Sequence, residues 1–187
     1  FWVGDTHTLD VESMGPDGTL HRLYLSAWLD ARSGIFTGWY VTASPGSQAT
    51  LNALRKGITK FGIPYNAYVD NGREFLTYDI GGRGHRAKKV LADGSEPFAP
   101  PGVFERLGIT MTNVILRNAR AKLVEWRFED FKNCISRLFP TYTGGNVVEK
   151  PNRLKYVLKQ GEHIPTDAEV IAAVDTLIEG YMNCEAY

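Results

Sequence analysis

The stretch Val69-Asp70-Asn71-Gly72-Arg73-Glu74-Phe75 decides how the rest of the chain is interpreted. It follows an apolar run over 63–69 that is typical of a buried strand, so Asp70 falls where that strand ends. Asn-Gly is among the commonest turn dipeptides, and a plain turn is one interpretation of this stretch. A carboxylate at a strand tip can also be held rigidly and face a ligand. The choice between these two interpretations depends on which other carboxylates lie nearby.

The first of these carboxylates is Asp5, in a segment whose alternation over 1–11 predicts a strand. Asp5 and His7 share the apolar face of that strand, where a carboxylate is costly unless it is paired or binds metal. Asp10 and Glu12 point the other way, which predicts solvated side chains and favours Asp5 as a ligand. An Asp5 paired to a base and a hydrogen-bonded core His7 stay open as alternatives. The apolar positions of this face are Phe1, Val3, Leu9 and Val11.

Two more strands are predicted over 20–29 and 35–42, joined by short turns into an antiparallel meander. Ser44-Pro45 predicts the start of a helix, with Ser44 as N-cap, and Gly62 predicts its end. A fourth strand over 63–70 then follows a helix, so we expect it to run parallel to a neighbour. The apolar positions of the helix, expected to pack on the sheet, are Leu51, Leu54, Ile58 and Phe61.

The second half of the chain begins with a Gly- and Pro-rich segment over about 78–103, typical of a long surface insertion. Its basic residues either contact phosphates or form a solvated charge run. A short helix over 103–107, a fifth strand over 109–116 and a long helix over 117–139 are predicted next. Glu125 flanks the buried stripe of that helix and can face a cleft beside the sheet. The stripe consists of Val124, Phe128, Phe131, Ile135 and Leu138.

Beyond this helix, residues 140–165 are expected to be irregular. Thr166 to Glu169 has the pattern of a capping box, which predicts a last helix that extends to about Asn183. Its predicted apolar positions are Val170, Val174, Leu177 and Tyr181.

Composition limits the class of protein. The 21 basic residues equal the 21 acidic ones, which argues against a highly basic DNA-coating protein. Cys134 and Cys184 have no metal-ligand spacing and are expected to be reduced, part-buried thiols of a cytoplasmic protein. We find no apolar run long enough to span a membrane and no secretory signal. Since the chain starts inside a strand-like pattern without an initiator Met, we expect a fragment of a longer protein.

Three carboxylates on a strand, a strand tip and a helix predict a site for divalent cations, which prefer oxygen ligands. Two such ions about 4 Å apart can activate an attacking oxygen and stabilise the leaving oxygen at phosphorus. Neither a nucleophilic Ser or Cys motif nor a P-loop competes, because Gly81-Gly82-Arg83-Gly84 lacks the Lys-Ser/Thr pair.

Three motifs in order resemble those of DDE transposases and retroviral-type integrases: Gly4-Asp5-Thr6-His7, the 69–75 stretch, and Ala121-Lys122-Leu123-Val124-Glu125-Trp126-Arg127-Phe128. The wide gap between Asp70 and Glu125 and the Lys-x-Val-Glu-x-x-Phe form look most like the bacteriophage Mu transposase group. The resemblance implies an α/β, ribonuclease H-like fold with a five-stranded mixed sheet flanked by helices. It implies a catalytic core over 1–145, with 146–187 as an extended segment and C-terminal helix leading to a further domain.

The resemblance also implies an activity. Asp5, Asp70 and Glu125 would hold Mg²⁺ or Mn²⁺, two ions when DNA is bound, for cleavage at transposon ends and strand transfer into target DNA. His7 is expected as an active-site neighbour. A homo-oligomer in the DNA complex and a cytoplasmic, bacterial or phage setting are expected, and an ATPase that selects targets is left open. The expected DNA-contacting residues are Lys122, Asn118, Asn71, Arg73, Arg120, Arg86, Lys88 and Lys89.

Three other classes of function remain open at this point. A ribonuclease H-like nuclease or resolvase would have the same fold and act on another nucleic acid, because a fold does not determine the substrate. A non-catalytic DNA-binding or assembly module would keep the fold without binding metal. A bare structural scaffold would need none of the three carboxylates.

Overall fold

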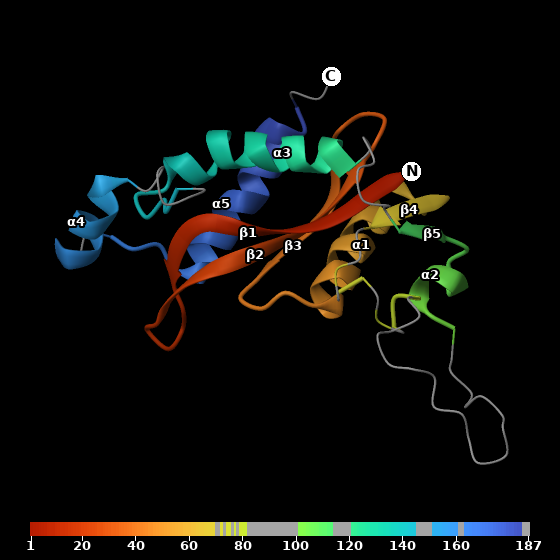
Figure 1. Cartoon of the computed structure of the whole chain (residues 1–187), viewed down its shortest axis with the longest axis horizontal. Helices are drawn as coiled ribbons and strands as arrows, with labels where there is room; N and C mark the ends of the chain where they lie inside the picture. The colour runs from red at the N-terminus through yellow and green to blue at the C-terminus, as the bar shows by residue number, and fades with distance from the viewer. Residues whose placement is uncertain are drawn as a thin grey trace, which may run out of the picture.

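The computed structural model contains one mixed sheet with helices on both faces (Figure 1). It describes residues 1–69, 72, 74–75, 77, 79–81, 101–113, 121–144, 151–160 and 163–184. Within these residues the strands are β1 (Trp2–Met14), β2 (Leu20–Asp30), β3 (Phe36–Thr42), β4 (Asn66–Val69) and β5 (Thr110–Asn113). The helices are α1 (Ser47–Phe61), α2 (Val103–Arg106), α3 (Ala121–Cys134), α4 (Asn152–Gln160) and α5 (Asp167–Leu177). Two short turns, the 3₁₀ turn η1 (Ser136–Leu138) and the π-helical turn η2 (Ile178–Met182), follow α3 and α5.

The order of the strands across the sheet is β3-β2-β1-β4-β5. Pairing is antiparallel from β1 to β2 and from β2 to β3, because short turns connect these strands. Pairing is parallel from β1 to β4, because α1 returns the chain to the end of the sheet at which β1 starts before β4 begins. Pairing is also parallel from β4 to β5. The predicted meander, the parallel fourth strand and the five-stranded mixed sheet are confirmed.

The two faces of the sheet carry separate cores. Val3 and Leu9 of β1 pack with Phe128 of α3 and Val174 of α5 on one face. Trp2 packs on the other face, in a cluster that α1, β4 and α2 complete. Successive β1 side chains alternate between these cores, as the pleat of a strand requires.

Trp28 of β2 joins several elements on the α1 face. Its indole Nε1 donates to the Thr50 carbonyl of α1 at 3.2 Å. Its ring packs edge-on against Phe75 and Phe104, with 5.9 Å between centroids in each pair. A side chain at Gly4 would place its Cβ 2.6 Å from this ring, so only glycine fits at that position.

Several helix boundaries differ from the prediction. α1 begins at Ser47 with Gly46 as N-cap rather than at Ser44, whose backbone N–H instead donates to Thr42 Oγ1 at 3.3 Å. α1 ends at Gly62, as predicted, in a positive-φ conformation that favours glycine. Phe61, the last residue of α1, was expected in the core, but it is exposed.

Changes of helical pitch account for two more corrections. Leu138 was placed in the buried stripe of the long helix but is 68% exposed, because α3 gives way to the 3₁₀ turn before it. Tyr181 was placed on the apolar face of the last helix but is exposed. The π-helical turn shifts the phase there, and Ile178 and Met182 are buried instead. The capping box that starts this helix at Thr166 is confirmed.

The segment 140–165 was expected to be irregular, yet it contains α4. Leu154 and Val157 lie one turn apart on this helix and are both buried, which gives it an apolar anchor. Both cysteines are free thiols, with Cys134 half-buried and Cys184 exposed rather than part-buried. Among the described helices, none is both long enough and apolar enough to cross a membrane.

We predict that Gly4→Ala destabilises the protein by about 1–3 kcal/mol, because the added methyl group overlaps the buried Trp28 ring. Urea unfolding monitored by circular dichroism measures the change. Gly180→Ala is the control, since a Cβ there meets no atom within 4 Å and alanine favours helix. Equal stability of the two variants would contradict the packing described for Trp28.

Candidate functional site

Asp5 lies in β1 on the face that α3 covers. Its neighbours Gly4 and Trp2 face the α1 side, whereas Val3 belongs to the core under α3 and α5. Asp5 shares the face of Val3 and is half-buried, and its Oδ1 accepts a hydrogen bond from Thr6 N at 2.7 Å. The sequence-based placement of Asp5 on the apolar face therefore agrees with the strand geometry.

His7 fixes the position of β1 relative to α3. Its imidazole stacks on the Phe128 ring with 5.0 Å between centroids and 17° between planes. Its Nε2 is buried and has no hydrogen-bond partner in the structure as described. Burial lowers the pKa of His7 below its ordinary value of 6.5, although the nearby Asp10 carboxylate acts in the opposite direction. The ring is therefore neutral near pH 7 and acts here as a packing surface.

Glu125 lies on α3, three residues before Phe128, and its side chain is exposed beside the buried stripe. In Figure 1, α3 and β1 run in the same direction, and the first turns of α3 lie toward the N-terminal end of β1. On β1, Asp5 comes two residues before His7, the residue that contacts Phe128 of α3. Asp5 and Glu125 therefore lie toward the same end of the β1–α3 contact.

Asp70 itself lies outside the described residues, but the chain on either side of it is placed. Val69 is buried and pairs in parallel with Gly4, the residue before Asp5. Phe75 is also buried, against the Trp28 ring. The stretch that carries Asp70 is thus anchored at both ends on one side of the sheet, next to the strand that carries Asp5.

The residues expected to contact DNA are not tested by the structure. The side chain of Lys122, in α3, lies outside the described part. So do Asn118, Asn71, Arg73, Arg120, Arg86, Lys88 and Lys89. The part of the chain that is described contains no group of three His, Cys, Asp or Glu side chains that could hold a metal ion. Because Asp70 is not in that part, convergence of the three carboxylates stays a prediction.

Asp10 was expected to be solvated, and this is wrong. It is 5% exposed, and the Arg22 guanidinium of β2 donates to its carboxylate. Arg22 Nε also donates to the Leu9 carbonyl at 2.7 Å. An irregularity in the β1–β2 register after Thr8 lies beside this pair. Asp10 is therefore a structural carboxylate paired with Arg22. Asp5 stays the metal-ligand candidate on this strand because Asp10 is occupied by Arg22, and not because Asp10 is solvated, as was predicted.

A Ser, His and Asp cluster that the sequence did not suggest lies at the start of α5. Asp167 Oδ1 accepts from Ser13 Oγ at 2.7 Å and contacts His21 Nε2 at 2.8 Å. Both partners bind the same carboxylate, so His21 is not placed to take a proton from Ser13, as a hydrolase would require. The cluster instead attaches α5 to the β1–β2 hairpin.

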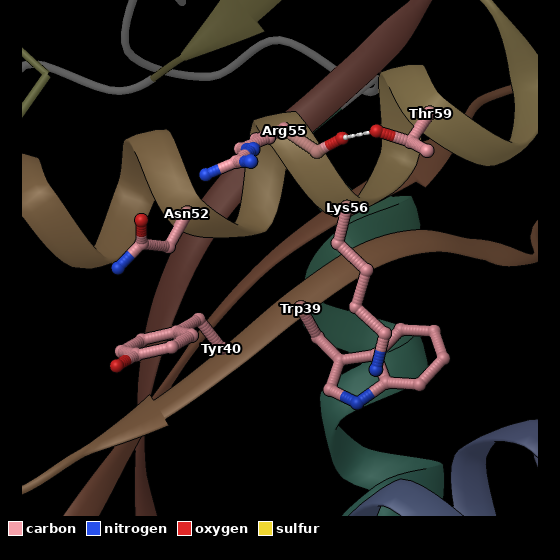
Figure 2. A pocket seen from close by; sticks show the side chains of 6 residues that line it. All are labelled: Trp39, Tyr40, Asn52, Arg55, Lys56 and Thr59. Atoms are coloured by element: carbon pink, nitrogen blue, oxygen red, sulfur yellow. Dashed lines mark hydrogen bonds between the residues drawn. The ribbon is translucent and has the colours of Figure 1, made fainter.

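A surface hollow of about 420 Å³ lies between α1 and the edge strand β3 (Figure 2). Lys56 extends across it, with its ammonium 3.6 Å from the Trp39 ring centroid and 3.0 Å from Asp175 Oδ1 of α5. Trp39 Nε1 donates to the same carboxylate oxygen at 2.5 Å. These contacts connect α1 and α5 across the edge of the sheet, so their role is structural.

Comparisons with known proteins give matches at the level of structure only. No protein-family model and no curated protein matches the chain. Two forms of the HTLV-2 integrase catalytic core domain in complex with magnesium, dimeric and trimeric, are similar to it, with TM-scores of 0.50 and 0.51. Each is 18% identical and is matched over 94% of this chain and 83% or 82% of its own length. The fold is that of a ribonuclease H-like integrase core.

A chain from the simian T-cell lymphotropic virus intasome in complex with the PP2A regulatory subunit B56 gamma is also similar, with a TM-score of 0.50 and 18% identity. The match covers 94% of this chain but only 47% of the intasome chain. Likeness at this level of identity concerns the fold alone.

We predict that His7→Phe makes stability less sensitive to acid. In the wild type, the contribution of neutral His7 to the free energy of unfolding is fully present above pH 6.5. It is lost as the pH falls through the lowered pKa of folded His7, because the unfolded chain takes up the proton first. Phenylalanine keeps the ring stack on Phe128 without a titrating group. Urea unfolding at about pH 7.5 and pH 5.5 tests this; equal losses of free energy of unfolding in both proteins would contradict it.

Proposed function

We propose that the chain is the catalytic core of a DDE-type DNA transposase or integrase, most like the bacteriophage Mu transposase group. The observation that carries the proposal is the pairing of Gly4 with Val69, since these are the residues before Asp5 and Asp70. Tyr68 packs in the same core as Val3. If β4 continues by one residue, the alternation of its side chains places Asp70 on the Asp5 face, one strand away.

The third carboxylate fits the same end of the sheet. The His7–Phe128 stack sets α3 against β1, and Glu125 is exposed one turn before Phe128. An oxygen-only set of Asp5, Asp70 and Glu125 suits Mg²⁺ or Mn²⁺. When bound, two such ions supply activation of the attacking oxygen and stabilisation of the leaving oxygen. The set therefore fits the metals that the proposed activity needs.

The residues of the chain would have separate tasks in an in-line displacement at a DNA phosphate. Asp5 would be held by the paired core of β1 and Asp70 by the tip of β4, so both would be rigid. Glu125 would reach the site from a helix whose position depends on the packing of Phe128. Lys122, Asn118, Asn71, Arg73, Arg120, Arg86, Lys88 and Lys89 would contact the DNA.

The proposal extends to the partners. The substrates would be transposon-end DNA and target DNA, bound by a homo-oligomer, in a bacterial or phage-encoded cytoplasmic system. The intasome and the dimeric and trimeric cores among the similar structures support the homo-oligomer and the DNA partner of this proposal. The catalytic core would comprise residues 1–145, with an insertion at about 78–103.

We predict that Asp5→Asn, Asp70→Asn and Glu125→Gln each abolish strand transfer and weaken Mn²⁺ binding. Their melting temperatures should stay within about 2–4 °C of the wild type, because each amide keeps the shape of the side chain it replaces. Strand transfer into plasmid DNA and calorimetric Mn²⁺ titration measure the two effects. Duplexes copied from the ends of the encoding element are the substrate.

Glu129→Gln is the matched control, since Glu129 lies one turn after Glu125 on α3 and pairs with Lys132 at 2.8 Å. It should retain strand transfer and Mn²⁺ affinity. Substantial strand transfer by any of the three carboxylate variants refutes the role of that residue. Faster cleavage of an RNA–DNA hybrid than of the end duplexes would instead indicate a ribonuclease H-like nuclease.

A further inference from the structure

Trp126 is exposed, unlike the other three tryptophans of the chain. Trp2, Trp28 and Trp39 are 6%, 1% and 2% exposed, whereas Trp126 is 61% exposed. Tryptophan buries more apolar surface than most side chains, so its exposure in the body of a helix forgoes a large gain from burial. The exposed face of this indole is therefore available to a ligand.

Trp126 lies on a turn of α3 whose next residues are packed against the rest of the protein, and it is beside the proposed site. It follows Glu125 and lies about 100° further around α3, on the side away from the sheet. The next residues fix the helix: Phe128 stacks on His7, and Arg127 Nη2 donates to the Met182 carbonyl at 2.7 Å. Within the residues that the structure places, the Trp126 indole has no ring partner, cation contact or hydrogen bond.

The surroundings of Trp126 disfavour an apolar protein contact. A protein hot spot is usually enclosed by other apolar groups that exclude water. Among the α3 side chains that the structure describes, the exposed neighbours of Trp126 are polar: Glu125, Glu129 and Asn133. An isolated flat ring among polar groups suits a ligand that is itself a flat ring with polar edges.

The charge of the chain gives a second argument. With 21 basic and 21 acidic residues, the chain lacks the excess of cations that supplies most non-specific DNA affinity. Stacking of a nucleobase on an aromatic side chain does not depend on that charge and works for any base sequence. Bases in an intact duplex are already stacked on each other, so only an unpaired base is available.

We propose that Trp126 stacks on an unpaired nucleobase of DNA whose backbone lies at the carboxylate site. The inference rests on the proposed function, and it adds that the substrate has a single-stranded or frayed segment next to the reacting phosphate. Trp126 would hold that segment on the outer face of α3, one residue from Glu125.

The exposure pattern makes the test direct, because iodide quenching of the intrinsic fluorescence mainly reports Trp126. The 187-residue chain is titrated with a duplex that has a short 3′ overhang and with a blunt duplex of the same sequence. We expect the overhang duplex to quench the emission and protect it from iodide. Trp126→Ala should weaken binding of the overhang duplex by about 5- to 150-fold and binding of the blunt duplex little.

Two variants serve as controls. Trp126→Phe keeps an aromatic face and should retain most of the affinity for the overhang duplex. Tyr65→Ala removes an even more accessible ring, 89% exposed. Tyr65 lies just before β4 begins, at the opposite end of that strand from Asp70, so this variant should change neither affinity.

The outcomes separate the two proposals. If Trp126→Ala binds the overhang duplex as tightly as the wild type, or if iodide protection rises with protein concentration in the absence of DNA, the stacking role is wrong. The second result would mean that Trp126 lies in a protein–protein contact. If the wild type binds neither duplex, the proposed function fails together with this inference, whereas the carboxylate variants test the chemistry independently.

Discussion

The contact between the Trp28 ring and the backbone of Gly4 constrains how β1, β2 and α1 pack together. It lets a large indole lie directly against β1, where any side chain would collide with it. From there the ring reaches α1 through Thr50 and packs on Phe75 and Phe104. One residue therefore connects the strand that carries Asp5 to the far end of the stretch that carries Asp70. The packed core on the α1 face therefore supports the strand whose other face carries Asp5.

On the opposite face, the His7–Phe128 stack joins β1 to α3. His7 contacts α3 through its ring, and its buried Nε2 has no hydrogen-bond partner among the described residues. Burying such a group is unfavourable, and the apolar packing between α3 and β1 must compensate for it. A helix held by ring packing can carry an exposed Glu125 without a direct ion pair to the sheet. In the proposed enzyme, Asp5 would be held by the pairing of β1, whereas Glu125 would be the more adjustable carboxylate.

The sequence predicts the parts of this fold that depend on neighbouring residues. Alternation in β1, the Gly62 helix end and the Thr166 capping box are local patterns, and each is confirmed. The Asp10–Arg22 pair was missed because its partners lie on different strands, and the exposure of Tyr181 was missed because a π-helical turn changes the period. For the site, sequence places Asp5 on the correct face. The partner of His7 needs the tertiary structure, because no local pattern connects residue 7 to residue 128.

The central claim is that Asp5, Asp70 and Glu125 form one metal site. A crystal structure of the chain soaked in Mn²⁺, with an anomalous difference map collected for manganese, tests it most directly. We expect a manganese peak bound by oxygens of Asp5 and Asp70, with Glu125 on the same side of the sheet. An Asp70 carboxylate on the α1 face, or a manganese ion bound away from Asp5, would contradict it.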